Sequence, residues 1–229
     1  MKFYWIKTNW IIKKIFFNYT WDVSNTTNTV YLTFDDGPIP EVTAWVLEEL
    51  KKHDLKATFF CIGENIDKHP EIFKKVISEG HGIGNHTFYH LNGWKTATKT
   101  YIENIRLCEQ VIEKIIGYNL KSKLFRPPYG KLKTAQSRAI QNLGYKIIMW
   151  DVLSADFDTT LSKEKCLANV LSNVKPGSII VFHDSVKAFK NLEYVLPKTL
   201  DFLKENNFKC GVLNNLQLFL NDSNKSVGI

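Results

Sequence analysis

The chain has 229 residues, a formal net charge of +7, and 15 Phe, 9 Tyr and 6 Trp. This length is enough for one large domain with a sizeable hydrophobic core. The excess lysines are scattered along helical segments, as at Lys51-Lys52 and Lys74-Lys75, without a dense basic run or a nucleic-acid motif. The composition therefore argues against a nucleic-acid partner, because positive charge is not gathered on one segment.

The segment before residue 30 is basic and aromatic. Three lysines interrupt its apolar runs: Lys7, Lys13 and Lys14. We therefore predict neither a signal peptide nor a membrane span, and a cytoplasmic or membrane-peripheral location. Five apolar residues are spaced to form one face of a short helix: Trp5, Trp10, Ile11, Ile15 and Phe16. We expect an N-terminal extension, 1–29, whose helix packs on the domain; contact with a membrane surface is the alternative.

From residue 30 onward, short apolar runs alternate with amphipathic segments. We expect strands at 30–35, 56–62, 82–85, 123–126, 145–150, 178–183 and 208–213. We expect helices at 40–53, 64–79, 97–116, 132–143, 162–173 and 191–206. Near-continuous apolar strands separated by helices favour parallel strands with right-handed crossovers. The predicted fold is α/β, a distorted (β/α)7 barrel in a single domain over 30–215, followed by a tail over 216–229; an open doubly wound sheet is the competing topology.

Polar residues follow most of the predicted strands. They are Asp35 and Asp36, His86, Arg126, Asp151 and Asp156, and His183 with Asp184. In a parallel barrel the carboxyl ends of the strands gather on one face, where active sites are built. We therefore expect these side chains to meet at one site.

Two adjacent carboxylates, Asp35 and Asp36, end the first predicted strand, so a cation or a shared proton is implied. His86 and His90 are four residues apart, which places both rings on one side of a turn. One aspartate and two histidines fill three positions around a divalent metal and leave a fourth open, the ligand count of a catalytic site. The pattern does not decide which aspartate binds the metal and which accepts a proton.

These residues supply the groups needed for hydrolysis. A carboxylate can take the proton of the attacking water, and His183 can protonate the leaving group. A backbone N–H near Tyr129 would hold the oxyanion. Arg126 requires an anion, for which the carboxylate base is a natural partner, and Asp156 can orient His183. The plain structural alternatives are ordinary buried ion pairs and a core histidine at a strand end.

Five ordered motifs make the chain resemble the polysaccharide deacetylase family, also called the NodB-homology or carbohydrate esterase family 4 domain. They are Thr33-Phe34-Asp35-Asp36-Gly37-Pro38, His86-Thr87-Phe88-Tyr89-His90, Arg126-Pro127-Pro128-Tyr129-Gly130, Trp150-Asp151-Val152-Leu153-Ser154-Ala155-Asp156-Phe157 and Ile179-Ile180-Val181-Phe182-His183-Asp184. The resemblance extends over 30–215. It implies a distorted barrel, usually of seven strands, that removes acetyl from N-acetylated sugars; some members act on O-acetyl xylan.

The resemblance also implies a role for each site residue. Asp35 would be the base, steadied by Arg126, and His183 the acid, tuned by Asp156. The metal, usually zinc, would be bound by Asp36, His86 and His90. The expected substrate contacts are Tyr129, Pro128 and Phe157. Phe157 stands where the family usually has Trp, and its smaller ring offers less stacking area to a sugar.

The expected function is metal-dependent deacetylation of an N-acetylated glycan, of the chitooligosaccharide or peptidoglycan type, by a monomer. The alternatives are an O-acetyl esterase, a hydrolase of small cyclic amides, and a non-catalytic carbohydrate-binding barrel. A degenerate, non-catalytic copy is expected to lose the base, a metal ligand or the acid. This sequence retains all five: Asp35, Asp36, His86, His90 and His183.

Overall fold

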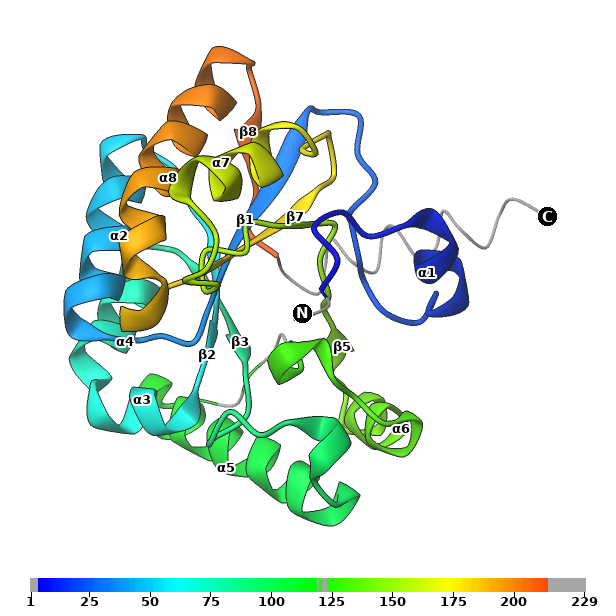
Figure 1. Cartoon of the computed structure of the whole chain (residues 1–229). Coiled ribbons are helices and arrows are strands. Elements are labelled where there is room, and N and C mark those ends of the chain that lie inside the picture. Colours follow the sequence, from blue (N-terminus) through cyan, green and yellow to red (C-terminus); the bar gives the residue numbers. More distant parts are fainter. Residues whose placement is uncertain (1–3, 119, 121–122, 214–229) are drawn as a thin grey trace.

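The computed structural model describes residues 4–118, 120 and 123–213 (Figure 1). The strands are β1 (Thr29–Asp35), β2 (Thr58–Cys61), β3 (Gly82–Asn85), β4 (Leu124–Phe125), β5 (Lys146–Ile147), β6 (Val152–Leu153), β7 (Ile179–His183) and β8 (Lys209–Cys210). The α-helices are α1 (Trp10–Ile15), α2 (Pro40–Lys52), α3 (Gly63–Lys68), α4 (Pro70–Ser78), α5 (Thr98–Ile116), α6 (Thr134–Asn142), α7 (Lys163–Leu171) and α8 (Val186–Glu205). The predicted tail, 216–229, lies outside the described residues.

The strands form one curled sheet in the order β5-β4-β3-β2-β1-β7-β6, and β8 pairs with the start of β1. Neighbouring strands are parallel throughout this order. Helices α2, α4, α7 and α8 cover the outside of β1, β2 and β7, while α1 lies across the sheet from α2 and α8 (Figure 1). The predicted α/β barrel is therefore confirmed as a curled half-barrel, in place of an open doubly wound sheet.

Several predicted elements have shifted ends, as in α8, which begins at Val186 instead of at residue 191, and two predicted elements differ more. The predicted helix 64–79 is two helices, α3 and α4, because Pro70 lacks a backbone N–H and starts the second helix. The predicted strand 145–150 is shortened to β5, and an unpredicted strand, β6, pairs with β7. Strands of two residues are too short to produce a periodic pattern in the sequence.

The two faces of strand β1 lie in different surroundings, one apolar and one polar. Phe34 faces the covering helices and stacks between Phe59 and Phe182, with ring centroids 5.1 and 5.7 Å apart. Thr33 and Asp35 face the inside of the barrel, where both bind Arg126. Because successive side chains of a strand point to opposite faces, one strand supports both the apolar core and a polar site.

The segment 4–23, which we call the N-terminal strap, spans the gap between the two edge strands of the sheet. Lys7 forms an antiparallel bridge with Val152 in β6, and Thr20 forms a parallel bridge with Ile148, just after β5. The backbone N–H of Met149 donates to the Thr20 carbonyl at 2.7 Å. The strap thus occupies the place of the strand that would complete the barrel, and it hides edges that would otherwise expose unpaired backbone groups.

Asp151 fastens the strap to the barrel. Its carboxylate is fully buried and binds the ammonium groups of Lys7 and Lys13 and, at 2.6 Å, the hydroxyl of Ser178. Burial alone would raise the pKa of Asp151, but these three donors lower it below its ordinary value. The expectation that Asp151 belongs to the functional site is wrong, because it precedes β6 and its side chain faces the strap.

The prediction that the apolar residues Trp10, Ile11 and Ile15 pack α1 on the domain is also wrong. In α1, Trp10, Ile11 and Ile15 are 63%, 48% and 60% exposed. Ile12 packs on the core instead, and Lys13 reaches Asp151. No helix within the described part of the chain is long and apolar enough to cross a membrane.

The ion pairs of Asp151 give a stability prediction. Replacing Lys13 by Met should lower the free energy of unfolding by about 2–3 kcal/mol, because a fully buried carboxylate loses one of its two cations. Lys14→Met, one residue further along, is the control and should change stability little, because Lys14 is exposed and contacts only the Trp10 ring among the described interactions. Urea denaturation of both variants measures the difference; equal effects would contradict the anchoring role of Asp151.

Candidate active site

The carboxyl ends of the strands open into a cavity of about 710 Å³. Seven of the predicted site residues line it: Asp35, Asp36, His86, His90, Tyr129, Phe157 and His183. Arg126 and Asp156 are fully buried behind this wall and contact the residues that form it. Pro128 is buried in a 3₁₀ turn and does not line the cavity, whereas its neighbour Pro127 does. The expected contact of Pro128 with substrate stays a prediction, which this position does not support.

Arg126 holds Asp35 from inside the barrel. Its Nη1 donates to Asp35 Oδ1 at 2.7 Å and to Thr33 Oγ1 at 2.8 Å, and its Nη2 donates to the Met149 carbonyl at 3.0 Å. The guanidinium lies 4.1 Å from the centre of the Phe60 ring. A fully buried arginine must be paired, so this network fixes the position of the Asp35 carboxylate. Thr33, two residues before Asp35 on the same face of β1, is a positioning residue that the sequence analysis did not identify.

Three potential metal ligands meet beside Asp35. The ligand atoms of Asp36, His86 and His90 all lie within 4.8 Å of one another. Asp36 Oδ1 is 3.2 Å from His90 Nε2 and 3.8 Å from His86 Nε2. His86 Nδ1 lies 2.8 Å from the Arg126 carbonyl, which accepts a hydrogen bond from a protonated Nδ1 and so leaves Nε2 with a lone pair facing Asp36.

This donor set fits a divalent cation. Asp36 Oδ1 is buried, and among the described residues it pairs with the ring nitrogens of His90 and His86, a position that is costly for a carboxylate unless a cation balances its charge. Burial lowers the pKa of His86 to about 4, so its ring is the neutral form that binds metals. Burial alone would raise the pKa of Asp36, but the imidazoles of His90, His183 and His86 hold it well below its usual range.

His183 and Asp156 form a second pair across the cavity floor. Strands β1 and β7 align Asp35 with His183, so both side chains lie on the inner face of the sheet. His183 Nδ1 is 2.8 Å from Asp156 Oδ1, and the backbone N–H of His183 donates to Asp156 Oδ2 at 2.9 Å. Burial alone would lower the pKa of His183, but the charge and hydrogen bond of Asp156, with Asp36 and Asp35 nearby, raise it to about 9. This imidazole is therefore protonated at neutral pH.

The turn after the two aspartates is held by Asp184, a residue the sequence analysis placed at this pole without a role. Asp184 Oδ1 accepts from the Gly37 N–H at 3.0 Å, and Oδ2 accepts from the Thr43 hydroxyl at 2.6 Å. A Cβ at Gly37 would lie 2.0 Å from Asp184 Oδ2, so only glycine fits here. In the sequence, the Gly-Pro pair after Asp36 indicated a turn, but it did not show that Asp184, 147 residues later, holds that turn.

Two asparagines hold the loop that carries His86 and His90. Asn85 Oδ1 accepts from the Thr87 N–H at 2.9 Å. Asn104 Oδ1, on α5, accepts from two backbone N–H groups of the loop at 2.8 and 3.0 Å. Thr87 and His90 have positive φ angles of 64° and 53°, a conformation that needs such support outside glycine. No sequence pattern pointed to Asn104, because a single polar residue on a long helix is ordinary.

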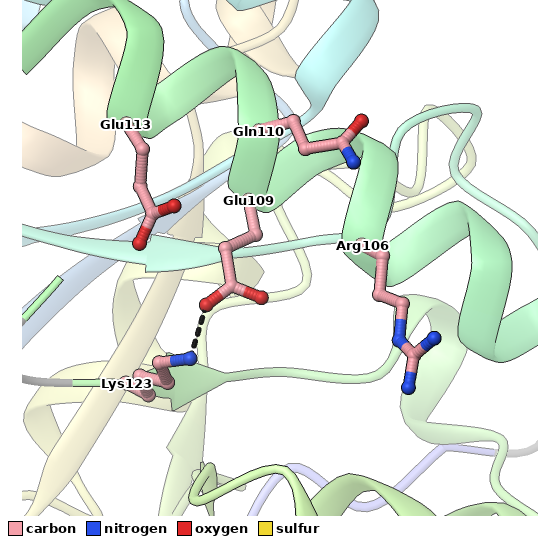
Figure 2. A pocket seen from close by; sticks show the side chains of 5 residues that line it. All are labelled: Arg106, Glu109, Gln110, Glu113 and Lys123. Atoms are coloured by element: carbon pink, nitrogen blue, oxygen red, sulfur yellow. Dashed lines mark ion pairs between the residues drawn. The ribbon is translucent and has the colours of Figure 1, made fainter. Parts of the chain in front are cut away.

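A second pocket, of about 350 Å³, lies outside the barrel, beside α5 and the start of β4 (Figure 2). Arg106, Glu109, Gln110 and Glu113 of α5 and Lys123 line it, and Glu109 forms an ion pair with Lys123. Its charges tie α5 to the strand. It holds none of the predicted site residues, so the cavity at the strand ends is the candidate active site.

Comparison with known families and proteins gives consistent results. A sequence model described as "Polysaccharide deacetylase" matches residues 22–148. A peptidoglycan-N-acetylglucosamine deacetylase of Bacillus cereus is 37% identical over 181 residues, which are 79% of this chain and 64% of that protein. A chitooligosaccharide deacetylase of Azorhizobium caulinodans is 35% identical over 162 residues, which are 71% of this chain and 76% of that protein. The chain thus spans somewhat less than two thirds of the first relative and about three quarters of the second.

Solved structures agree in fold. A crystal structure of a peptidoglycan N-acetylglucosamine deacetylase, in complex with 4-naphthalen-1-yl-N-oxidanyl-benzamide, matches with a TM-score of 0.80 and 34% identity, over 91% of this chain and 95% of that one. A carbohydrate esterase family 4 pseudoenzyme from Bacillus anthracis matches with a TM-score of 0.74 and 24% identity, over 84% of this chain and 66% of that one, a likeness that shows the fold alone.

The arrangement of Asp36, His86 and His90 predicts metal binding. Zn²⁺ should bind at about one ion per chain and raise the temperature of thermal unfolding. His90→Ala should weaken the affinity by at least about 100-fold, since loss of an outer partner alone can cost about 10- to 100-fold. His53→Ala, at the end of α2 and outside the cavity, is the control for unspecific binding to histidine. Calorimetric titration measures both; unchanged affinity in His90→Ala would place the ion elsewhere.

Proposed function

The chain belongs to the polysaccharide deacetylase family, and on this premise we propose that it hydrolyses the acetamido groups of N-acetylglucosamine units in a glycan, with a divalent metal as cofactor. Zn²⁺ is the metal we propose, because one carboxylate and two imidazoles with an open fourth position are its usual catalytic set. The proposal is supported above all by one observation. Asp35, His183 and the three potential ligands all line the same cavity, and each of the first two has a fully buried partner behind it.

The residues of the chain divide the reaction among them. When bound, the metal would polarise the acetyl carbonyl and acidify the attacking water. Asp35, positioned by Arg126, accepts a proton from that water as its oxygen bonds to the carbonyl carbon. The carbon–nitrogen bond then breaks, and the sugar nitrogen takes a proton from His183. The products are acetate and a free amino sugar.

The substrate class follows from the relatives and from the wall of the cavity. Relatives carry names of deacetylases that act on peptidoglycan N-acetylglucosamine and on chitooligosaccharides. Tyr129 is 59% exposed at the edge of the cavity, and its hydroxyl lies 3.1 Å from His90 Nδ1. Phe157 lies against His183, with ring centroids 4.8 Å apart. These two rings would offer an aromatic surface to the sugar on either side of the reacting acetamide.

Acetate release tests the proposal directly. The zinc-loaded protein should release acetate from chitooligosaccharides or peptidoglycan fragments, and a chelator should abolish the release. Asp35→Asn should lower the rate by about 10²–10⁴-fold, because the amide keeps the shape of the carboxylate but cannot accept the proton. Asp67→Asn, on the exposed side of α3, is the matched control and should retain the rate.

Other outcomes of this assay would reject the proposal. Release from acetyl-xylan alone would assign an O-acetyl esterase. Binding of glycans without any release of acetate would assign a carbohydrate-binding protein on an enzyme fold. A normal rate in Asp35→Asn would show that another group is the base, and loss of metal in that variant would exchange the roles of Asp35 and Asp36.

The raised pKa of His183 predicts the alkaline side of the pH profile. An acid must be protonated to act, so kcat/KM should fall as the pH rises through about 9. The charged groups that raise this pKa are Asp156, Asp36 and Asp35, with Asp156 the largest of them. Asp156→Asn should therefore move the alkaline fall to lower pH by at least about one unit. An alkaline limb that stays in place in this variant would mean that a different group sets it.

A further inference from the structure

Five aromatic side chains of the N-terminal strap line the cavity: Tyr4, Trp5, Phe16, Tyr19 and Trp21. We propose that the strap is a glycan-binding wall, which stacks on sugar rings of the polymer beside the ring that is deacetylated. This inference rests on the proposed function, because it assigns to the same cavity an extended carbohydrate as substrate.

The strap begins next to the proposed acid. The Tyr4 hydroxyl donates to Asp158 Oδ2 at 2.8 Å, and the Tyr4 ring meets the edge of Phe157 with centroids 5.4 Å apart. Phe157 in turn contacts His183. A chain of ring contacts therefore runs from His183 through Phe157 to Tyr4, at the start of the strap.

Two of the strap aromatics are partly exposed where they line the cavity. Trp5 and Phe16 line the cavity and are 38% and 41% exposed, in contrast to Trp21, which is 6% exposed and belongs to the core. Phe16 stacks on Tyr19, with centroids 5.7 Å apart and ring planes 12° apart. A flat apolar face, such as that of a sugar ring, binds favourably to a partly exposed aromatic ring, because stacking removes apolar surface of both from water.

The backbone of the strap is fixed before any ligand arrives. Trp150 Nε1 donates to the Trp5 carbonyl at 3.1 Å, and Trp21 Nε1 donates to the Phe16 carbonyl at 3.0 Å. Both bonds use main-chain oxygens, so replacing the Trp5 or Phe16 side chain leaves their acceptors in place. Because the wall is already ordered, a polymer that binds along it does not bear the entropic cost of organising it.

The test compares Trp5→Ala and Phe16→Ala with two matched controls from the same segment. Trp10→Ala and Phe17→Ala also remove aromatic rings, 63% and 81% exposed, but these rings do not line the cavity. The zinc-loaded, full-length proteins are assayed on a pentamer of N-acetylglucosamine and on a small activated acetyl ester. For Trp5→Ala and Phe16→Ala, kcat/KM on the pentamer should fall by about 3- to 10-fold more than kcat/KM on the ester. In the controls, this ratio should not change.

The test uses the ratio of kcat/KM on the pentamer to kcat/KM on the ester, and this ratio does not depend on folding, because a fraction of inactive protein lowers both values equally. Equal losses on both substrates, or ratios as altered in Trp10→Ala and Phe17→Ala as in the other two variants, would overturn the inference. Failure of the proposed function looks different, since wild-type protein would then release no acetate from the pentamer. In that case, calorimetric titration of wild type and of Trp5→Ala with the pentamer still tests whether the strap binds glycan. Equal affinities, or no binding at all, would overturn the inference.

Discussion

The pairing of Arg126 with Asp35 inside the barrel is the constraint on which the rest of the site depends. A fully buried guanidinium has a large desolvation penalty, so its partners must be placed accurately. It meets that requirement with a carboxylate, a hydroxyl and main-chain carbonyls, and with the face of Phe60. The same residue reaches the metal site, because its own carbonyl binds His86 Nδ1. One residue, through its side chain and its main-chain carbonyl, therefore links the proposed base to the ring that would hold the metal.

The half-barrel also depends on a segment outside the repeated βα units. Its edge strands, β5 and β6, are two residues long each and cannot close the sheet by themselves. The strap closes this gap with backbone bridges on both sides and with lysines around Asp151. The segment that completes the fold thus also supplies one wall of the cavity, so stability and substrate contact are coupled in this part of the chain.

Sequence reasoning was strongest where a pattern is local. Apolar runs and helix periodicity predicted the fold class and most elements, and the position of polar residues at strand ends predicted which side chains gather in one cavity. The roles of the individual residues remain predictions. Local patterns could not reveal Asn104, whose side chain accepts from two loop N–H groups that lie 16 and 15 residues earlier, in a different element. Nor could they show that Asp151 turns toward the strap, since its lysine partners lie more than a hundred residues earlier.

The alignment of Asp35 with His183 on adjacent strands has a consequence for how such a site can change. Hydrogen-bonded strands of a sheet lie about 4.8 Å apart, and this spacing is a property of the backbone. Substitutions and insertions in the loops can reshape the rim, but they cannot move the proposed base and acid apart without breaking the pairing of β1 and β7. The reacting pair and the rim of the cavity can therefore vary to different extents. The spacing of the pair is fixed by the sheet, whereas the side chains at the rim can change and alter which polymer binds.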